Sequence, residues 1–206
     1  MPLREPQVSR LHEQLRMLEI RIHGRGGQGV VTAAELLSIA AFREGQYAQA
    51  FPSFGSERMG APVTSFCRLD AQPIRVREPI DRPDVIVVQD PTLLASHDVF
   101  AGLGSDGFLL VNSSRGFAEL GLADWVARFR TGRARCVPAT ELAREHLGRP
   151  LPNAALLGGL AGLTGAVRIE SVTAAIRERF PGAVGERNAA AAAAAYAISR
   201  TEPAPC

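Results

Sequence analysis

The chain runs Leu18-Glu-Ile-Arg-Ile-His23, then Gly24-Arg25-Gly26-Gly27-Gln28-Gly29, then an apolar segment from Val30 to Arg43. The first six residues alternate apolar and polar side chains, which is typical of a β-strand. In the third segment apolar residues recur at helical spacing, and Gly45 ends the pattern. The stretch therefore predicts a strand, a glycine-rich turn and a helix.

The rest of the chain alternates strand-like and helix-like segments. Strands are expected at residues 47–51, 62–69, 84–89, 107–112 and 133–138, and helices at 122–130, 140–147, 153–164, 171–180 and 186–200. Thr140 and Ser171 are expected to cap the helices that they begin, and the Val-Ile-Val-Val run within 84–89 favours a parallel strand buried on both faces. We predict an α/β fold: a single three-layer Rossmann-like domain with a mostly parallel sheet and a helical C-terminal part.

Length and charge limit the class of protein. The chain has 206 residues, enough for one domain to bury roughly 70% of its unfolded surface. We expect an N-terminal extension at residues 1–16, one domain at 17–200 and a tail at 201–206. The extension does not resemble a secretory signal, and no apolar stretch is long enough to span a membrane, so a cytoplasmic chain without membrane contact is expected. A net charge of +2, with acids and arginines interleaved, argues against nucleic-acid binding.

Lysine is absent, and all 23 basic residues are arginine. The absence of lysine excludes Schiff-base chemistry, a pyridoxal phosphate anchor and a Walker-type phosphate loop. Cys67, Cys136 and Cys206 are far apart, so their spacing fits neither an iron–sulfur cluster nor a structural zinc ion. We expect Cys67 and Cys136 to be core thiols.

The glycine loop has the spacing Gly24-x-Gly26-x-x-Gly29, the local fingerprint of dinucleotide binding. A nicotinamide site also needs an acidic residue at the end of the second strand to hold a ribose, and the segment 47–51 ends without one. Three interpretations stay open: a nicotinamide site, glycines that only allow close packing, or a loop that receives a phosphate or a partner, with Arg25 as fork donor. His23 is interpreted as a hydrogen-bonded strand-end histidine rather than a catalytic one.

Four blocks of sequence together resemble one family: Met17–Gly29, Tyr47–Pro62, Val87–Pro91 and Asn153–Gly158. The blocks G-R-G-G-Q-G and F-G-S-E-R-M-G-A-P, in that order, are the specific ones. From Met17 to Tyr196 the chain resembles the gamma subunit of 2-oxoacid:acceptor oxidoreductases, of which pyruvate:ferredoxin oxidoreductase is the best known.

The resemblance implies a subunit of a complex that oxidatively decarboxylates a 2-oxoacid to acyl-CoA. The complex would use thiamine diphosphate, Mg²⁺, [4Fe-4S] clusters and coenzyme A, with electrons passing to ferredoxin or another acceptor. Its other parts would be thiamine-binding alpha and beta subunits, a ferredoxin-like delta subunit and an additional acceptor subunit if the acceptor is not ferredoxin. Pyruvate is the default substrate, with 2-oxoglutarate, branched-chain 2-oxoacids and arylglyoxylates as alternatives.

This chain would bind none of the cofactors alone and would hold no catalytic residue or metal. The hypothesis is that it packs on the thiamine subunits and helps hold coenzyme A. The expected binding residues are Gly24, Arg25, Gly26, Gly27, Gln28 and Gly29 in the glycine loop, and Ser56, Glu57 and Arg58 in the second block. A stand-alone NAD(P)-binding module and a purely scaffolding subunit are the alternatives.

Overall fold

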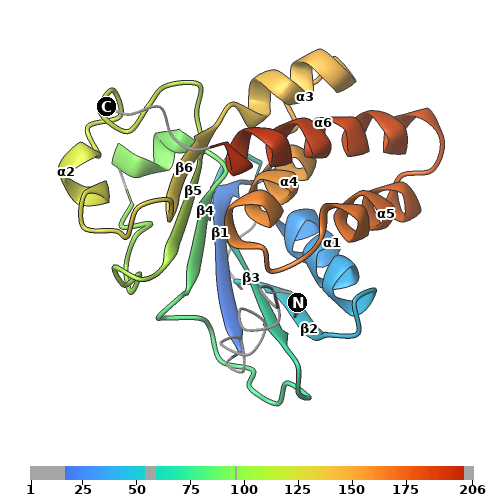
Figure 1. Cartoon of the computed structure of the whole chain (residues 1–206), viewed down its shortest axis with the longest axis horizontal. Coiled ribbons are helices and arrows are strands. Elements are labelled where there is room, and N and C mark those ends of the chain that lie inside the picture. The colour runs from blue at the N-terminus through green and yellow to red at the C-terminus, as the bar shows by residue number, and fades with distance from the viewer. Residues whose placement is uncertain (1–16, 54–58, 96, 202–206) are drawn as a thin grey trace, which may run out of the picture.

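The structure is a computed structural model that describes residues 17–53, 59–95 and 97–201. Within them one sheet of six strands has the order β2-β3-β1-β4-β5-β6 (Figure 1). The strands are β1 (Leu18–Arg25), β2 (Tyr47–Pro52), β3 (Pro62–Asp70), β4 (Val85–Val88), β5 (Phe108–Asn112) and β6 (Ala134–Val137). The pairs β1/β4, β4/β5 and β5/β6 are parallel, whereas β3 is antiparallel to both of its neighbours. The mostly parallel sheet that the sequence predicts is confirmed.

Helices cover the two faces of the sheet unequally (Figure 1). One face carries a thick layer made of α1 (Val30–Phe42), α3 (Ala139–Leu147), α4 (Asn153–Thr164), α5 (Ile169–Arg179) and α6 (Ala183–Arg200). Over the other face the described chain places only the 3₁₀-helix η1 (Pro91–Ala95), the short helix α2 (Ala123–Val126) and loops. The three predicted layers are present, and one of them is thin.

Alternation along β4 explains why its sequence contains no polar residue. Val85 and Val87 belong to the core beneath the thick helical layer, whereas Ile86 and Val88 belong to the core on the other face. Successive side chains of a strand point to opposite faces, so a strand covered on both sides needs apolar residues at every position. The prediction of a doubly buried parallel strand is confirmed.

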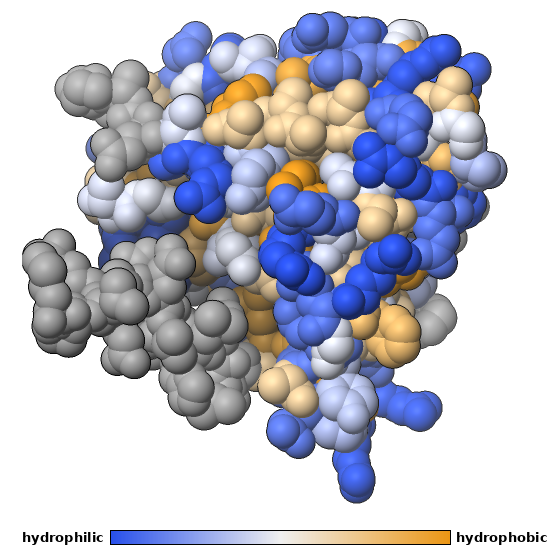
Figure 2. All heavy atoms as spheres, turned by 45° about the vertical axis from the view of Figure 1, so that its right-hand side comes forward, coloured by the Kyte–Doolittle hydropathy of each residue, from blue (hydrophilic) through white to orange (hydrophobic). Residues whose placement is uncertain are grey.

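The alanine-rich C-terminal segment forms α6, the packed terminal helix that its composition favours. Ala191, Ala192 and Ala195 are buried against the rest of the helical layer. Exposed alanines lie on the outward side of the same helix. Figure 2, turned so that the right-hand side of Figure 1 comes forward, shows pale, weakly hydrophobic surface among hydrophilic side chains over this layer.

Two predicted helix caps are wrong. α3 begins at Ala139, so Thr140 lies in its first turn; the Thr140 amide donates to Asn112 Oδ1 at 3.1 Å, and Asn112 Nδ2 donates to the Thr140 hydroxyl at 2.8 Å. The side-chain amide of Asn112, at the end of β5, therefore provides the hydrogen-bond partners for Thr140 in the first turn of α3. α5 begins at Ile169, and the amide of Ser171 donates to the carbonyl of Arg168 at 3.1 Å.

The helix predicted at residues 122–130 is shorter than expected. α2 covers only Ala123–Val126, and the amide of Phe129 then donates to the carbonyl of Val126, three residues back, at 3.0 Å. This i→i−3 hydrogen bond replaces the α-helical pattern after Val126. The Trp125 ring stacks on Phe100, with ring centroids 4.1 Å apart, so aromatic packing rather than a further helical turn fixes this segment.

Residues 1–16 and 202–206 lie outside the described residues, so the division into extension, domain and tail stays a prediction. Within the described residues, no helix combines the length and the apolar character that crossing a membrane requires.

Candidate functional site

The glycine loop leads from the end of β1 into α1. The amide of Gln28 donates to the carbonyl of Arg25 at 3.1 Å, which closes a tight turn. Gly27 has φ +90° and Gly29 has φ +74°, values that glycine adopts without steric cost. A Cβ atom on Gly29 would also lie 2.7 Å from Asn153 Nδ2 at the start of α4. Glycine is needed here both for the backbone turn and for the close approach of α4.

The segment before β3 is hydrogen-bonded to the glycine loop through backbone groups. The amide of Gly26 donates to the carbonyl of Ala61 at 2.8 Å, and the amide of Gly60 donates to the carbonyl of Gly26 at 3.0 Å. This pairing joins the two most specific of the four sequence blocks that carry the family resemblance. Ser56, Glu57 and Arg58, expected in the second block as binding residues, lie outside the described residues.

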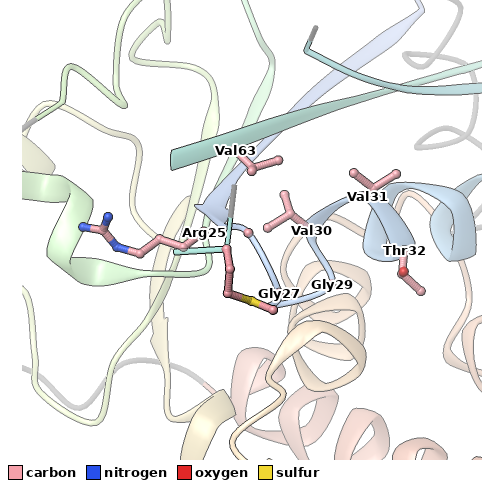
Figure 3. A pocket seen from close by; sticks show the side chains of 9 residues that line it. Arg25, Gly27, Gly29, Val30, Val31, Thr32 and Val63 are labelled. Carbon is pink, nitrogen blue, oxygen red and sulfur yellow. The ribbon is translucent and has the colours of Figure 1, made fainter. Parts of the chain in front are cut away.

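Arg25 contacts neighbouring protein groups rather than the helix start. Its Nε and Nη2 atoms donate to the Thr92 hydroxyl at 3.1 and 2.8 Å, Nη1 donates to the carbonyl of Gly60 at 3.1 Å, and Nε lies 3.3 Å from Asp90 Oδ2. Figure 3 shows the side chain extending away from Val30, Val31 and Thr32. That Arg25 contacts a bound phosphate stays a prediction.

Two pockets flank the glycine loop. The first, of about 380 Å³, is lined by Gly26, Gly27 and Gly29 together with the apolar side chains of Val30, Val31, Met59 and Val63 (Figure 3). The second, of about 530 Å³, lies between the loop and the helices α4 and α6, and it shares Gly27, Gly29 and Thr32 with the first. Five of the six expected loop residues line one of the two pockets: Arg25, Gly26, Gly27, Gln28 and Gly29.

The second pocket gathers polar side chains that make no hydrogen bond within the part of the chain that the structure describes. Arg149, before α4, and Arg187, in α6, both line it, and neither guanidinium makes a hydrogen bond or ion pair with another described residue. The Asn153 side chain also lines this pocket; Asn153 is only 8% exposed, and its amide has no hydrogen-bond partner among the described residues. The two arginine guanidinium groups and the Asn153 amide border the same space, so the pocket suits a polar ligand.

Helix starts add positive potential at the same place. α1 begins at Val30 and α4 at Asn153, and both starts border the second pocket. The amides of Gly29 and Val30 donate to no acceptor among the described residues, as expected where a helix begins. Free amides, the helix dipole and two guanidinium groups together favour an anion.

The apolar part of the second pocket is made by Leu147, Leu151, Phe180 and Val184. Among the described residues that line either pocket, the ionisable side chains are the arginines alone. The site therefore offers binding groups for an anion attached to an apolar body; among the described residues that line it, Thr32 carries the one hydroxyl group, and no histidine or carboxylate is in the lining to activate it.

His23 lies beneath the loop, in β1, and is held by hydrogen bonds. Arg21 Nε donates to His23 Nε2 at 2.9 Å, and the Thr64 hydroxyl lies 3.3 Å from His23 Nδ1. Burial, and then the charges of Arg21 and His97, lower the pKa of His23 to about 3. The interpretation as a hydrogen-bonded strand histidine is confirmed.

The cysteine prediction also holds for the two described thiols. Cys67 is fully buried and Cys136 partly buried, and burial raises the pKa of each to about 12. Within the described ranges, no three His, Cys, Asp or Glu side chains gather in a way that would hold a metal ion.

Comparison with known proteins shows the family of this chain. Residues 19–198 match the family described as pyruvate ferredoxin/flavodoxin oxidoreductase. The chain belongs to this family. The resemblance that the four sequence blocks indicate is thereby confirmed.

The relatives of this gamma-type subunit are themselves subunits. The chain is 52% identical over 180 residues to the pyruvate/ketoisovalerate oxidoreductases common subunit gamma of Thermococcus kodakarensis, and the match covers 87% of this chain and 96% of that one. It is 48% identical, with the same coverages, to the pyruvate synthase subunit PorC of Methanothermobacter marburgensis. The crystal structure of pyruvate oxidoreductase subunit PORC from Thermotoga maritima has a TM-score of 0.74 at 36% identity, covering 88% of this chain and 96% of that chain. The chain is thus a subunit of a multi-subunit 2-oxoacid oxidoreductase.

Arg149, Asn153 and Arg187, polar residues of the second pocket whose side chains have no hydrogen-bond partner among the described residues, were not among the expected site residues. Asn153 begins one of the blocks that carry the resemblance, and this was the available signal for it. Arg149 and Arg187 are separated by 38 positions in a chain with many arginines, and only the fold brings them to one pocket.

Proposed function

We propose that this gamma-type subunit holds the phosphate groups of coenzyme A for a complex that oxidises a 2-oxoacid. The observation that supports this role is the second pocket, where the side chains of Arg149, Arg187 and Asn153 border one space and have no hydrogen-bond partner among the described residues. Coenzyme A carries a pyrophosphate and a 3′-phosphate, and guanidinium groups bind phosphate oxygens with a planar pair of donors. The helix starts beside the pocket add free amides for the same anion.

The size and the apolar wall of this pocket fit the rest of a nucleotide. Its volume of about 530 Å³ lies within the range of small-molecule sites, roughly 300 to 1,000 Å³. Leu151, Phe180 and Val184 offer a surface against which a flat heterocycle can pack. The pocket would therefore hold the nucleotide end of coenzyme A and leave its thiol free to reach a neighbouring subunit.

The chemical step would take place on the neighbouring subunits. In the overall reaction a 2-oxoacid and coenzyme A give acyl-CoA, CO₂ and a proton, and two electrons pass to the acceptor. Thiamine diphosphate, with Mg²⁺, supplies the carbanion chemistry, and [4Fe-4S] clusters on a ferredoxin-like subunit carry the electrons to ferredoxin or another acceptor. The two described cysteines offer no thiolate set for such a cluster.

Pyruvate is the first substrate to test. The relatives from Methanothermobacter and Thermococcus carry pyruvate in their names, and the latter is a subunit common to pyruvate and ketoisovalerate oxidoreductases. A shared gamma subunit is consistent with substrate selection on the thiamine-bearing subunits. Branched-chain 2-oxoacids are therefore the second class to test.

A stand-alone nicotinamide site is disfavoured by the sheet. In the dinucleotide-binding fold, an acid follows a parallel strand beside β1 and binds the ribose. Here β2 lies at the edge of the sheet, and Asp90, which follows the neighbouring strand β4, already accepts hydrogen bonds from Gln28 and Thr92. No described acid at this place is free for a ribose.

Steady-state kinetics of the assembled complex test the proposal. We expect Arg149→Ala and Arg187→Ala each to raise the KM for coenzyme A about tenfold or more, since a hydrogen bond to a charged group contributes about 1.5–3 kcal/mol. The KM for pyruvate should stay within about twofold, because the 2-oxoacid binds elsewhere.

Arg200→Ala is the matched control. Arg200 is an exposed arginine at the opposite end of the same helix, α6, and it does not line the pocket. This variant should leave both KM values unchanged. If the complexes assemble and the KM for coenzyme A is unchanged in both pocket variants, the purely scaffolding role replaces the proposal.

A further inference from the structure

Gln28 has a fixed orientation within the glycine loop. Its Oε1 atom accepts a hydrogen bond from the backbone amide of Arg25 at 2.9 Å, so the Nε2 atom must face the other way. Nε2 donates to Asp90 Oδ2 at 2.7 Å, and the backbone carbonyl of Gln28 accepts from Gln89 Nε2 at 2.6 Å. The loop is thereby tied to the two residues that follow β4.

Asp90 accepts hydrogen bonds on both of its carboxylate oxygens. Oδ1 accepts from the Thr92 amide at 3.0 Å and from the Thr92 hydroxyl at 2.6 Å, while Oδ2 accepts from Gln28 and lies 3.3 Å from Arg25 Nε. Only a carboxylate has acceptors on both atoms, because the amide of an asparagine replaces one of them by a donor. The residue is 8% exposed, so water cannot readily replace a lost partner.

Asp90 lines neither of the two pockets, whereas Gln28 lines the second. Asp90 contacts both Gln28 and Arg25, but of these two only Gln28 lines the second pocket, so its effect on a ligand there passes through Gln28 and the loop. The residues on either side of Gln28 are the two glycines with positive φ, so the backbone beside it has little stiffness of its own. The Gln28–Asp90 hydrogen bond supplies the restraint that these glycines lack.

We propose that Asp90 is a positioning residue for coenzyme A: through Gln28 it holds the glycine loop in the conformation that presents the start of α1 to the phosphate groups. This inference rests on the proposed function. It predicts that the donor–acceptor complementarity between positions 28 and 90, rather than either residue by itself, sets the affinity for the coenzyme.

Exchange of the two side-chain types tests this directly. Asp90→Asn places an amide donor against the Gln28 donor, and Gln28→Glu places two carboxylates together; both break the pairing. In the double variant Gln28→Glu/Asp90→Asn, the glutamate accepts from the Arg25 amide and from the new asparagine, which restores the pairing in reverse. Asp124→Asn, at an exposed carboxylate in α2, is the control.

We expect each single variant of the assembled complex to raise the KM for coenzyme A about fivefold or more, the effect of leaving a buried donor or acceptor unpaired. The pyruvate KM and the kcat at saturating coenzyme A should stay within about twofold, and the double variant should return the KM for coenzyme A to within about twofold of the parent. If Asp90→Asn fails to assemble, the double variant carries the test, because its polar groups are again paired.

Other outcomes overturn the inference in distinguishable ways. If Arg187→Ala raises the KM for coenzyme A while Asp90→Asn and Gln28→Glu leave it unchanged, the positioning role is wrong and the binding role stands. If the double variant is no better than the single variants, or fails to assemble, the route through Gln28 is wrong. If Arg149→Ala, Arg187→Ala and Asp90→Asn all leave this KM unchanged, the proposed function itself fails.

Discussion

His23 is a buried histidine whose neutral form the fold requires. Its Nε2 atom accepts the hydrogen bond from Arg21, so a proton there would remove the acceptor and place a second charge beside the guanidinium. Burial is the largest cause of its lowered pKa, about 3, against an ordinary value of 6.5. Between these two pH values the unfolded chain binds a proton that the folded chain does not bind.

The stability of the chain should therefore fall as the pH is lowered below about 6.5, towards 3. The sign follows from linkage: the state that binds more protons, here the unfolded one, is favoured by acid. One histidine contributes a slope of up to about 1.4 kcal/mol in the free energy of unfolding per pH unit. Urea unfolding at a series of pH values measures this slope.

His23→Gln provides the control, because a glutamine oxygen can still accept from Arg21 without titrating. We expect the slope for this variant between pH 6 and 4 to be smaller than that of the parent by about one proton. Equal slopes for the two proteins would show that His23 is not the group responsible.

The pKa of Asp90, like that of His23, lies below its ordinary value, but here the charged form is the one that the neighbouring groups stabilise. Burial raises the pKa of Asp90, but the hydrogen bonds from Thr92 and Gln28 and the charge of Arg25 together bring it below the ordinary value. A carboxyl group with a lowered pKa stabilises the fold above its ordinary pKa, and this contribution is lost as the pH falls through the lower, folded value. Asp90 thus stays ionised at neutral pH, the form in which both of its oxygens accept hydrogen bonds.

At the scale of single residues, the sequence located the glycine loop but not its surroundings. Gly27, Gln28 and Gly29 line the second pocket as expected. Arg25 was predicted from its place in the motif, and no local pattern shows that Thr92 and Asp90, more than 60 positions away, share its guanidinium. Arg149 and Arg187 could not be singled out from the sequence, because only the fold brings these two arginines to one pocket.

Among the helices, the contact between α4 and α6 depends on small residues. A Cβ atom built on Gly158 would overlap the backbone carbonyl of Ala192, and one on Gly162 would lie 2.7 Å from the carbonyl oxygen of Tyr196. Backbone atoms cannot rotate away as a flexible side chain can. The two helices are therefore held at a distance that only glycine in α4 and small residues in α6 permit.

Gly158→Ala should destabilise the chain in spite of alanine's better helix propensity. Overpacking a core contact costs about 1–3 kcal/mol, whereas the change from glycine to alanine within a helix gains about 1 kcal/mol. Because the contact is with rigid backbone, we expect the upper part of this range, a net loss of up to about 2 kcal/mol in the free energy of unfolding, measured by denaturant titration. Because α4 borders the second pocket, the KM for coenzyme A should rise as well.

Gly104→Ala is the comparison variant. A Cβ atom at Gly104 has no neighbour within 4 Å, and its φ is not positive. This change should alter stability by no more than about 0.5 kcal/mol. If both variants unfold at the same denaturant concentration, close packing of α4 on α6 is not what Gly158 provides.

Element by element, the sequence predicted best where local patterns and tertiary packing agree. β1 and α1 begin at the expected residues and α1 ends within one residue of the prediction, because glycine punctuation and periodicity coincide there, but β1 continues two residues further, through Gly24 and Arg25, because these pair with β3. α3 and α5 begin before the residues predicted to cap them, Thr140 and Ser171. The backbone amide of Thr140 finds its acceptor in Asn112, a residue distant in sequence, which no local pattern reveals. α2 is shorter than expected because the packing of Trp125 decides its length.

The arrangement of the whole domain explains why the site lies where it does. The parallel strands β1, β4 and β5 end at the same edge of the sheet, and hydrogen bonds join Gln28, Gln89 and Asn112, which follow or end these strands. Ligands of open α/β sheets bind at such carboxyl ends. Among the described residues that line the two pockets at this edge, the polar side chains are those of arginines, amides and Thr32, which suits a subunit that contributes binding groups to a shared site.

The structure of the assembled complex with coenzyme A bound is the most direct test of the proposed role. It should place a phosphate of coenzyme A within hydrogen-bonding distance, about 3 Å, of Asn153 and of Arg149 or Arg187. The start of α1 should face the same phosphate. An ordered coenzyme A whose phosphate groups contact only the other subunits would contradict the account.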